Sequence, residues 1–235
     1  MLEINKLSAG YGELLVLKDV SINVAPGEMV ALIGPNGAGK STVLKSVFGL
    51  TKITSGEIRY KDEKITGMPT HELLGIGVSY VPQGKINFTN LTVMENLLLG
   101  ADGLNGKEAL QAALTRVFSK FPVLQEKKDQ LAYALSGGQQ QMLAIARSLM
   151  KNPSLILFDE PSLGLSPKLV HETFSIIGSL RSEGICILIV EQNAKKAIEM
   201  ADRTYLLEDG KVALEGGKEI LKNPKIKKVY LGGRY

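Results

Sequence analysis

The chain has 235 residues, of which 44% are hydrophobic and 22% are charged, and its formal net charge is +4. This composition excludes a disordered chain and allows a sizeable buried core in one globular unit. The longest apolar stretches, residues 155–158 and 185–190, are far shorter than the ~20 residues of a membrane-spanning helix, so we expect the protein to be soluble by itself.

Two further features concern localisation and redox chemistry. The sequence does not open with a basic segment, an apolar run and a small-residue cleavage site, so we expect a cytoplasmic chain. The single cysteine, Cys186, lies in the apolar run ICILIV. We therefore expect a buried thiol with no catalytic or metal-binding role, and no disulfide within the chain.

The excess positive charge gathers near the C-terminus. It is carried by Lys218, Lys222, Lys225, Lys227 and Lys228. A solvated helix face is our main interpretation, and contact with an anionic surface is the alternative. No aromatic residues alternate with the basic ones to form a stacking platform, so we do not expect a nucleic-acid partner.

The first part of the chain predicts short strands and one phosphate-binding turn. Residues 2–7 and 18–24 are expected strands, broken by Gly10, Gly12 and the Pro26-Gly27 turn. The continuous apolar run at residues 29–33 is typical of a buried parallel strand.

A helix should follow Gly39. Apolar residues recur there at helical spacing, at Val43, Leu44, Val47 and Phe48. Further strands are predicted at residues 55–60 and 78–81.

The rest of the chain predicts a helical block and then a return to strands. Residues 91–150 carry mostly helical patterns and form a candidate helical subdomain. Short apolar runs at residues 155–158 and 186–190 indicate strands of a sheet covered on both faces. A hairpin is expected from residues 204–207 and 212–215 around the Asp209-Gly210 pair.

The string GPNGAGKST fits the pattern G-x-x-x-x-G-K-[ST] of phosphate loops and lies between the predicted strand and helix. We expect Lys40 to reach the outer phosphates, the Ser41 hydroxyl to bind Mg²⁺, and backbone amides of residues 36–42 to point at the phosphates. A glycine turn with a solvated lysine is the alternative. The predicted nucleotide-binding residues are Gly34, Pro35, Asn36, Gly37, Ala38, Gly39, Lys40, Ser41 and Thr42.

Two adjacent carboxylates, Asp159 and Glu160, end the apolar run LILF. At the carboxyl edge of a buried strand such groups meet ligands rather than core. Phosphoryl transfer to water needs a metal partner and a residue that orients the water, so we assign Asp159 to Mg²⁺ and Glu160 to the water. The alternative is a helix cap followed by a solvated acid.

A second helix start carries the string LSGGQ at residues 135–139. Ser136, Gly137 and Gly138 precede an expected first turn at residues 139–142, so this is a second anion-binding helix terminus in one chain. Ser136 is also a possible simple cap, but a cap does not need two glycines after it. Two copies that meet head to tail would use both phosphate-binding surfaces at once.

In this order the three strings resemble those of ATP-binding-cassette (ABC) ATPase subunits, over essentially the whole chain. The resemblance implies one nucleotide-binding domain over residues 1–235 with an α/β fold of the P-loop NTPase (RecA-like) type. That fold has a mostly parallel sheet core, an N-terminal antiparallel β subdomain and an inserted α-helical subdomain at about residues 91–150.

The resemblance also implies that two such subunits sandwich ATP and Mg²⁺. Signature residues Ser136, Gly137, Gly138 and Gln139 would then contact the nucleotide held by the partner subunit. Tyr11 would stack on adenine. Gln83 would sense Mg²⁺ and face the membrane subunits. Without the family pattern, Tyr11 is only a partly buried aromatic and Gln83 a turn residue.

The chain departs from the family pattern at two positions. Ser166 stands where an aspartate is common, which changes an expected contact between subunits. Gln192 stands where most members have a histidine after the acid; it can donate a hydrogen bond to the γ-phosphate but cannot become a cation. We expect hydrolysis to persist with weaker charge stabilisation. His71 and His171 fall outside every nucleotide motif.

Four strings are similar to those of one ATPase subunit of importers for branched-chain and other apolar amino acids, the LivF type. They are PQGKINFTNLTVMENL, EPSLGLSP, VEQN and the final YLGG. The resemblance implies a second ATPase subunit, either identical or different, and two membrane permease subunits. It also implies an indirect role for a substrate-binding protein and a place on the cytoplasmic face of the membrane.

ATPase subunits of urea importers look alike, so urea is an alternative cargo. A nucleotide-gated dimerising module with little hydrolysis is the alternative from another class. A protein acting on DNA or ribosomes is disfavoured.

Overall fold

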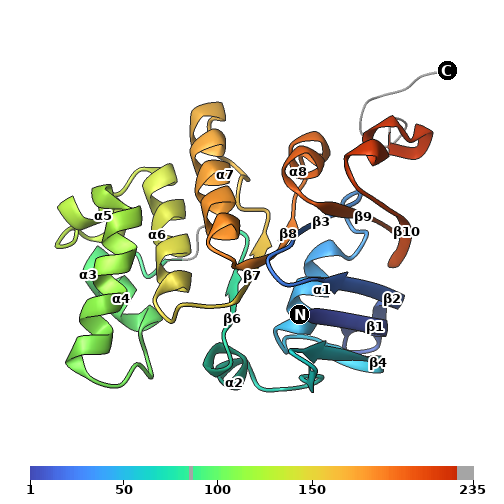
Figure 1. The fold of residues 1–235 in the computed structure, drawn as a ribbon, viewed down its shortest axis with the longest axis horizontal. Helices are drawn as coiled ribbons and strands as arrows, with labels where there is room; N and C mark the ends of the chain where they lie inside the picture. Colours follow the sequence, from blue (N-terminus) through green and yellow to red (C-terminus); the bar gives the residue numbers. More distant parts are fainter. Residues whose placement is uncertain (85–86, 227–235) are drawn as a thin grey trace.

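The computed structural model describes residues 1–84 and 87–226. They form two sheets with helices around them (Figure 1). The strands are β1 (Leu2–Tyr11), β2 (Leu14–Val24), β3 (Met29–Ile33), β4 (Lys52–Tyr60), β5 (Glu63–Lys64), β6 (Val78–Val81), β7 (Leu155–Asp159), β8 (Cys186–Val190), β9 (Arg203–Glu208) and β10 (Lys211–Gly216). The α-helices are α1 (Lys40–Val47), α2 (Thr70–Gly75), α3 (Val93–Gly100), α4 (Lys107–Lys120), α5 (Pro122–Glu126), α6 (Gly137–Leu149), α7 (Pro167–Ser182) and α8 (Ala194–Met200). Two 3₁₀ turns are η1 (Ala132–Ala134) and η2 (Lys218–Lys222).

The larger sheet has the strand order β10-β9-β3-β8-β7-β6 and is parallel except for the edge strand β10. Its central strands are buried on both faces, which explains their continuous apolar runs. The smaller sheet, β2-β1-β4-β5, is antiparallel. The expected α/β fold, with a mostly parallel core sheet and an antiparallel N-terminal sheet, is therefore confirmed.

Alternation along each central strand separates the core into two layers. In β3, Met29, Ala31 and Ile33 face the cluster that contains α6, α7 and α8, whereas Val30 and Leu32 face α1 and the antiparallel sheet. Side chains of a strand point to opposite faces in turn, so one run of five apolar residues serves both layers. The same alternation holds in β7 and β8.

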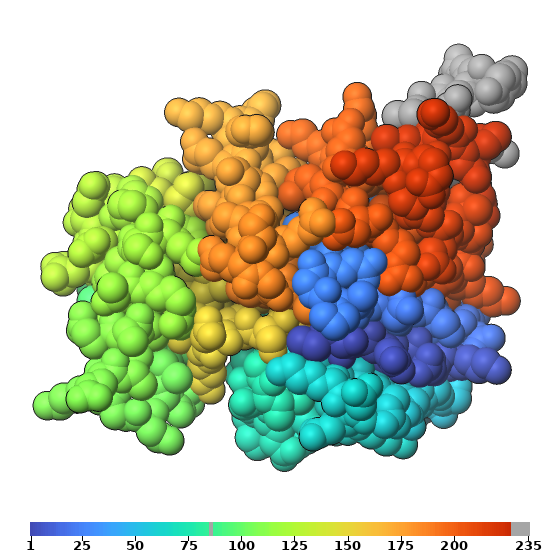
Figure 2. All heavy atoms as spheres, viewed as in Figure 1, coloured from blue at the N-terminus to red at the C-terminus, as the bar shows by residue number. Residues whose placement is uncertain are grey.

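Helices α3 to α6 gather at one end of the molecule and are called the helical block below (Figures 1 and 2). Residues of α3, α4, α5 and α6 share one continuous apolar cluster with β7 and α7. Thr92 begins α3 with a capping box that includes Glu95, and Ser136 begins α6 with one that includes Gln139.

Several predicted strand boundaries were wrong, because pairing between strands extends the strands beyond their local sequence signals. Gly10 does not break the first strand, because it pairs with Leu15 on one side and with Lys52 on the other, and the turn follows at Gly12. Strands β2 and β4 also begin earlier than predicted, at Leu14 and Lys52. These ladder bonds outweigh the low strand propensity of glycine.

Two other expectations concern the C-terminal part of the chain. The predicted hairpin of β9 and β10 forms around Asp209 and Gly210. In the basic cluster, Lys225 pairs with Glu208, while Lys218 and Lys222 are exposed on the 3₁₀ turn η2. Lys227, Lys228 and the YLGG string at residues 230–233 lie outside the described residues.

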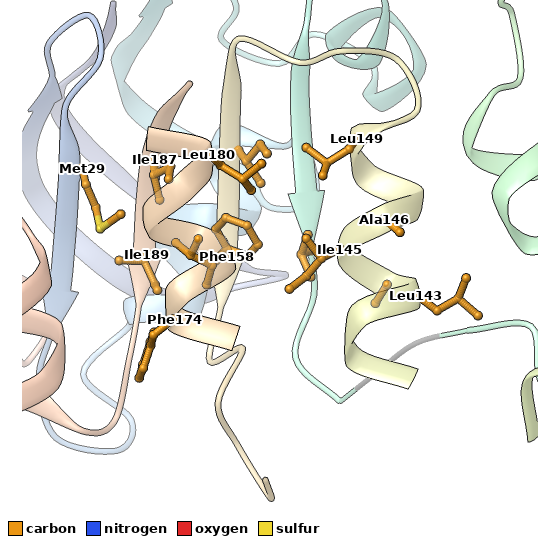
Figure 3. Close-up of a cluster of buried hydrophobic side chains, with 14 of the residues drawn as sticks. Met29, Leu143, Ile145, Ala146, Leu149, Phe158, Phe174, Leu180, Ile187 and Ile189 are labelled. Atoms are coloured by element: carbon orange, nitrogen blue, oxygen red, sulfur yellow. The ribbon is translucent and has the colours of Figure 1, made fainter. Parts of the chain in front are cut away.

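Phe158 is a central residue of the core. It lies on β7, in the same buried cluster as Phe174 and Leu180 of α7 and Ile189 of β8 (Figure 3). We expect Phe158→Ala to lower the free energy of unfolding by about 3–5 kcal/mol, because it removes a buried ring and leaves a cavity. Urea denaturation measures this change. Leu14→Ala, at a side chain that is 68% exposed, is the control and should change it by about 0.5 kcal/mol or less. Equal effects of the two substitutions would contradict the assignment of Phe158 to the core.

Candidate active site

The carboxyl ends of three neighbouring parallel strands meet at one edge of the larger sheet. β3 is followed by the phosphate loop, β7 ends at Asp159, and β8 is followed by Glu191 and Gln192. Loops at the carboxyl ends of parallel strands lie on the same side of a sheet, so segments more than a hundred residues apart in sequence converge there.

The phosphate loop leads directly into α1. Gly39 has φ +100°, a conformation that favours glycine, and a side chain there would collide with Leu17 Cδ2 at 2.8 Å from its Cβ. Because α1 begins at Lys40, its first backbone N–H groups face the loop. A helix N-terminus of this kind carries partial positive charge and binds phosphate groups.

The amine of Lys40 is held inside the loop. Its Nζ donates hydrogen bonds to the carbonyl oxygens of Gly34 at 2.8 Å and Pro35 at 3.1 Å, and the residue is buried. Burial lowers the pKa of Lys40, and the nearby carboxylates of Glu160 and Asp159 oppose that decrease. The loop thus holds a cation beside two acids without a direct ion pair to either.

Both carboxylate oxygens of Asp159 accept hydrogen bonds. The Ser41 hydroxyl donates to Oδ1 at 2.7 Å, and the Tyr80 hydroxyl donates to Oδ2 at 2.9 Å. Asp159 is 2% exposed, so these bonds replace its hydration. Burial, followed by the charge and hydrogen bond of Asp159, raises the pKa of Tyr80. Sequence reasoning missed Tyr80; its only signal was a polar tip on the expected strand 78–81.

Glu160 leaves the strand in an unusual conformation. Its φ is +49°, in the left-handed region that non-glycine residues rarely adopt. Its backbone N–H donates to Val190 O at 2.9 Å, which ties the end of β7 to the end of β8. Its Oε2 accepts a hydrogen bond from Gln83 Nε2 at 3.1 Å. The backbone strain is therefore stored at a candidate catalytic residue.

One cavity of about 480 Å³ brings most of these groups together. It is lined by Val16 and Leu163, by Asn36, Gly37, Gly39, Lys40, Ser41 and Thr42 of the phosphate loop, and by the polar side chains of Gln83, Glu160 and Gln192. The lining thus combines the anion-binding backbone amides of the loop with the Lys40 cation, the Glu160 carboxylate and the side-chain amides of Asn36, Gln83 and Gln192. Such a set can hold a chain of phosphates and place a water molecule beside it.

Some predicted site residues lie outside this cavity. Ser136 to Gln139 form the start of α6, in the helical block, and are not part of the lining. Tyr11 ends β1, is 42% exposed, and has Lys45 Nζ 6.0 Å from its ring centroid. His71 and His171 are both exposed, on α2 and α7. One copy of the chain therefore assembles only part of the predicted set.

The predicted first turn of the signature helix was wrong by two residues. α6 begins at Gly137, because the Ser136 side chain caps it by accepting a bond from the backbone N–H of Gln139 at 3.4 Å. Gly138 also has a packing role, since a Cβ there would lie 2.4 Å from Leu169 Cδ2.

Comparison with known proteins identifies the class. The profile of the family described as ABC transporter matches residues 17–163, and relatives with at least 30% identity cover nearly the whole chain. The chain belongs to the ABC transporter ATP-binding family and is an ATPase of that type.

Three relatives of this chain are ATP-binding proteins of transport systems. The chain is 45% identical to the high-affinity branched-chain amino acid transport ATP-binding protein BraG of Pseudomonas aeruginosa, covering 99% of this chain and 100% of the relative. It is 40% identical to the probable branched-chain amino acid transport ATP-binding protein LivF of Archaeoglobus fulgidus, with 99% of each covered. It is 34% identical to the lipopolysaccharide export system ATP-binding protein LptB of Escherichia coli K12, covering 96% and 95%.

Solved structures agree with the fold. The ADP conformation of MJ1267, an ATP-binding cassette of an ABC transporter, superposes with a TM-score of 0.89 at 30% identity, covering 99% of each chain. MJ0796, a bacterial ABC transporter cassette whose structure is dimeric, superposes with a TM-score of 0.79 at 29% identity, covering 93% of this chain and 99% of that one.

The strained backbone at Glu160 generates a prediction. At most positions glycine is less stable than alanine, but at φ +49° alanine carries the strain and glycine does not. We expect the free energy of unfolding of Glu160→Gly, measured by urea denaturation, to be about 1 kcal/mol higher than that of Glu160→Ala. The same pair of substitutions at Glu183, where φ is −84°, is the control and should show the opposite order. Alanine more stable than glycine at both positions would contradict the strain.

Proposed function

We propose that this chain is the ATP-hydrolysing subunit of a membrane importer for branched-chain or other apolar amino acids. The observation that carries the proposal is the single cavity shared by the phosphate loop, Gln83, Glu160 and Gln192. It supports an ATP-binding site in which the groups for phosphate binding and for water activation already lie together.

The phosphate loop would bind the triphosphate. Lys40 and the N-terminal amides of α1 meet the phosphate oxygens, and the exposed ring of Tyr11, at the end of β1, stacks on adenine. The binding residues of this proposal are Gly34, Pro35, Asn36, Gly37, Ala38, Gly39, Lys40, Ser41, Thr42 and Tyr11.

The oxygen atoms near Asp159 fit a hard cation. Ser41 Oγ lies 2.7 Å from Asp159 Oδ1, and Gln83 lines the same cavity as Ser41. Mg²⁺ takes one or two carboxylates together with substrate phosphates and water, so Ser41, Gln83 and Asp159, the last through a water, would hold it. When bound, Mg²⁺ supplies positive charge that neutralises the phosphates. Tyr80 keeps the Asp159 carboxylate oriented.

Water attack would be organised by Glu160. Gln83 donates to its carboxylate, and the bond from Glu160 N to Val190 O holds its backbone at the cavity wall. Glu160 accepts a proton from the attacking water, and Gln192 donates a hydrogen bond to the γ-phosphate. Because a glutamine amide stays neutral, it stabilises developing negative charge less than a protonated histidine would.

A second ATPase subunit, identical or related, would complete the site. Ser136, Gly137, Gly138 and Gln139 lie away from this chain's own cavity, at the start of α6, where a helix N-terminus can meet a phosphate bound by a partner. The dimeric structure of MJ0796, a bacterial ABC transporter cassette, supports a pair of ATPase subunits. ATP that binds better to the closed pair shifts the equilibrium towards closure.

Two membrane permease subunits are the proposed partners beyond the ATPase pair. A groove of about 380 Å³ between β6 and the helical block has an apolar part that includes Leu74, Phe88, Leu99 and Pro82, the residue before Gln83. Asp102, Arg147 and Lys151 add charge to its lining. A lining that is mostly apolar with charged residues suits an amphipathic segment of a permease. None of the helices in residues 1–84 and 87–226 is long and apolar enough to cross a membrane.

This arrangement would place the chain on the cytoplasmic face of the membrane, with the substrate-binding protein reached only through the permeases. The proposal includes no nucleic-acid partner. The names of BraG and LivF, the relatives at 45% and 40% identity, support the amino-acid cargo. Urea or another small solute is the competing cargo.

The first prediction of the proposal concerns turnover. We expect Glu160→Gln to lower steady-state phosphate release at least about 100-fold while ATP binding is retained, because the amide cannot accept the proton of water. Glu108→Gln, an exposed position of α4, is the control and should leave the rate unchanged. Turnover equal to the parent's would remove Glu160 from this role, and no release above background by the parent would favour a dimerising module.

The second prediction concerns binding. We expect Lys40→Ala to weaken ATP affinity at least about tenfold, because a charge-assisted hydrogen bond to phosphate is lost. Equilibrium binding of a fluorescent ATP analogue measures the change, with Lys107→Ala, at an exposed position on α4, as the control. Unchanged affinity in Lys40→Ala would contradict the phosphate-loop assignment.

The cargo is tested by copurifying the tagged chain with its membrane partners, followed by uptake in vesicles. We expect uptake of leucine to require this chain and ATP. Uptake of urea without leucine would replace the proposed cargo, and the absence of any membrane partner would overturn the transport role.

A further inference from the structure

A buried acid, Glu191, lies behind the proposed catalytic residues and has no part in the mechanism above. It follows β8, precedes Gln192, and is 1% exposed. A carboxylate at such a place is strongly disfavoured unless its oxygens accept hydrogen bonds. Both oxygens do: Ser162 donates from its backbone N–H to Oε1 at 3.1 Å and from its hydroxyl to Oε2 at 2.9 Å.

These two bonds join the loops that carry Glu160 and Gln192. Ser162 lies two residues after Glu160, in a loop built of two consecutive turns: Leu163 N donates to Glu160 O at 3.1 Å and Leu165 N donates to Ser162 O at 3.2 Å. Glu191 lies directly before Gln192. Any shift of the Ser162 loop relative to β8 must therefore break a bond to the buried carboxylate.

The Glu191–Ser162 pair lies on one side only of the cavity wall formed by Glu160 and Gln192. A second cavity, of about 470 Å³, is lined by Ser162, Glu191, Asn193 and Lys196 among others. Glu160, Leu163 and Gln192 line both this cavity and the one beside the phosphate loop, whereas Ser162 and Glu191 line only the second. Glu160 and Gln192 thus form a wall, and the Glu191–Ser162 pair supports it from behind.

We propose that Glu191 is a positioning residue for hydrolysis, whose two hydrogen bonds to Ser162 hold Glu160 and Gln192 in register with the phosphate loop. The inference rests on the proposed roles of Glu160 and Gln192. It explains how Glu160 keeps φ +49°: its own N–H is bonded to Val190 O, and the next turn is anchored to Glu191. A left-handed residue persists only where its surroundings determine it.

The Asn193 cap completes the support on the other side. Asn193 Oδ1 accepts from Lys196 N at 3.2 Å at the start of α8, and Gln192 O accepts from Ala194 N at 3.0 Å. Gln192 is held between this cap and the buried Glu191, while its side chain stays exposed to the cavity. Burial raises the pKa of Glu191, and the hydrogen bonds from Ser162 oppose that rise.

The test compares Glu191→Ala, Glu191→Gln and Ser162→Ala in steady-state ATP hydrolysis and equilibrium ATP binding. We expect Glu191→Ala to lower kcat roughly tenfold or more with ATP affinity within about twofold of the parent, because misplacement of a catalytic group slows the chemical step. We expect Glu191→Gln to retain most of the rate, since its amide can still accept from Ser162 N and donate to Ser162 Oγ. Ser162→Ala, which keeps the backbone bond, should lie between the two.

The double variant Glu191→Ala with Ser162→Ala should be no slower than Glu191→Ala alone, since both remove the same pair. Ser179→Ala, which removes a serine hydroxyl bond on the exposed side of α7, is the control and should leave kcat unchanged. Should Glu191→Ala fail to fold, as judged by thermal unfolding, Ser162→Ala and Glu191→Gln decide the question.

Two results would overturn the inference. One is additive losses in the double variant. The other is kcat equal to the parent's in Glu191→Ala and Ser162→Ala while Glu160→Gln is inactive. Full activity of Glu160→Gln would instead refute the underlying assignment of Glu160, so the two failures are distinguishable.

Discussion

The site depends on the parallel pairing of β3, β8 and β7. Hydrogen bonds between these strands set Val190 opposite Asp159 and Leu32 opposite Val190, so the three chain segments leave the sheet at one edge. Because every residue of the three strands is buried, a slip in this register would move apolar side chains out of their packed positions and separate Asp159 from its hydrogen-bond partners. The phosphate loop, the acid pair and Gln192 are placed by this constraint.

Charge at the edge is balanced by hydrogen bonds rather than by ion pairs. Asp159 accepts hydrogen bonds from the hydroxyls of Ser41 and Tyr80, and Glu191 accepts one from the hydroxyl of Ser162. Lys40 donates to carbonyl oxygens of the phosphate loop. A buried charge left without such partners would be strongly destabilising. The carboxylates of Asp159 and Glu160 lie near the Lys40 amine without a direct ion pair to it. The amine therefore remains able to bind phosphate.

Much of the fold could be predicted from the sequence because the core strands are short, apolar and uninterrupted. The run at β3, the pair at Asp159 and Glu160, and the Asp209-Gly210 turn each have a local signal. The end of β1 at Tyr11 has no such local signal, because it is set by the pairing of Tyr11 with Leu14 and by the pairing of β1 with β4. Likewise, α6 begins at Gly137 because its cap is a capping box, and the lack of a side chain at Gly138 leaves room for Leu169.

The parts of the site that were not predicted depend on contacts between distant residues. Tyr80 bonds to Asp159 and Glu191 bonds to Ser162 across 79 and 29 positions of sequence, and neither pair follows a periodic pattern. Tyr11 and Gln83 were found only through the family resemblance. Contacts to a second copy, which the proposed roles of Ser136 and Gly138 require, lie between two chains, and the sequence indicated them only through the LSGGQ string at residues 135–139.

The most direct measurement of the central claim is a crystal structure of the Glu160→Gln variant grown with ATP. The account predicts two copies head to tail, with the triphosphate of each ATP between Lys40 of one copy and Ser136 and Gly138 of the other. ATP bound to a lone copy that does not pair, or copies joined through a face that leaves Ser136 far from the phosphates, would contradict it.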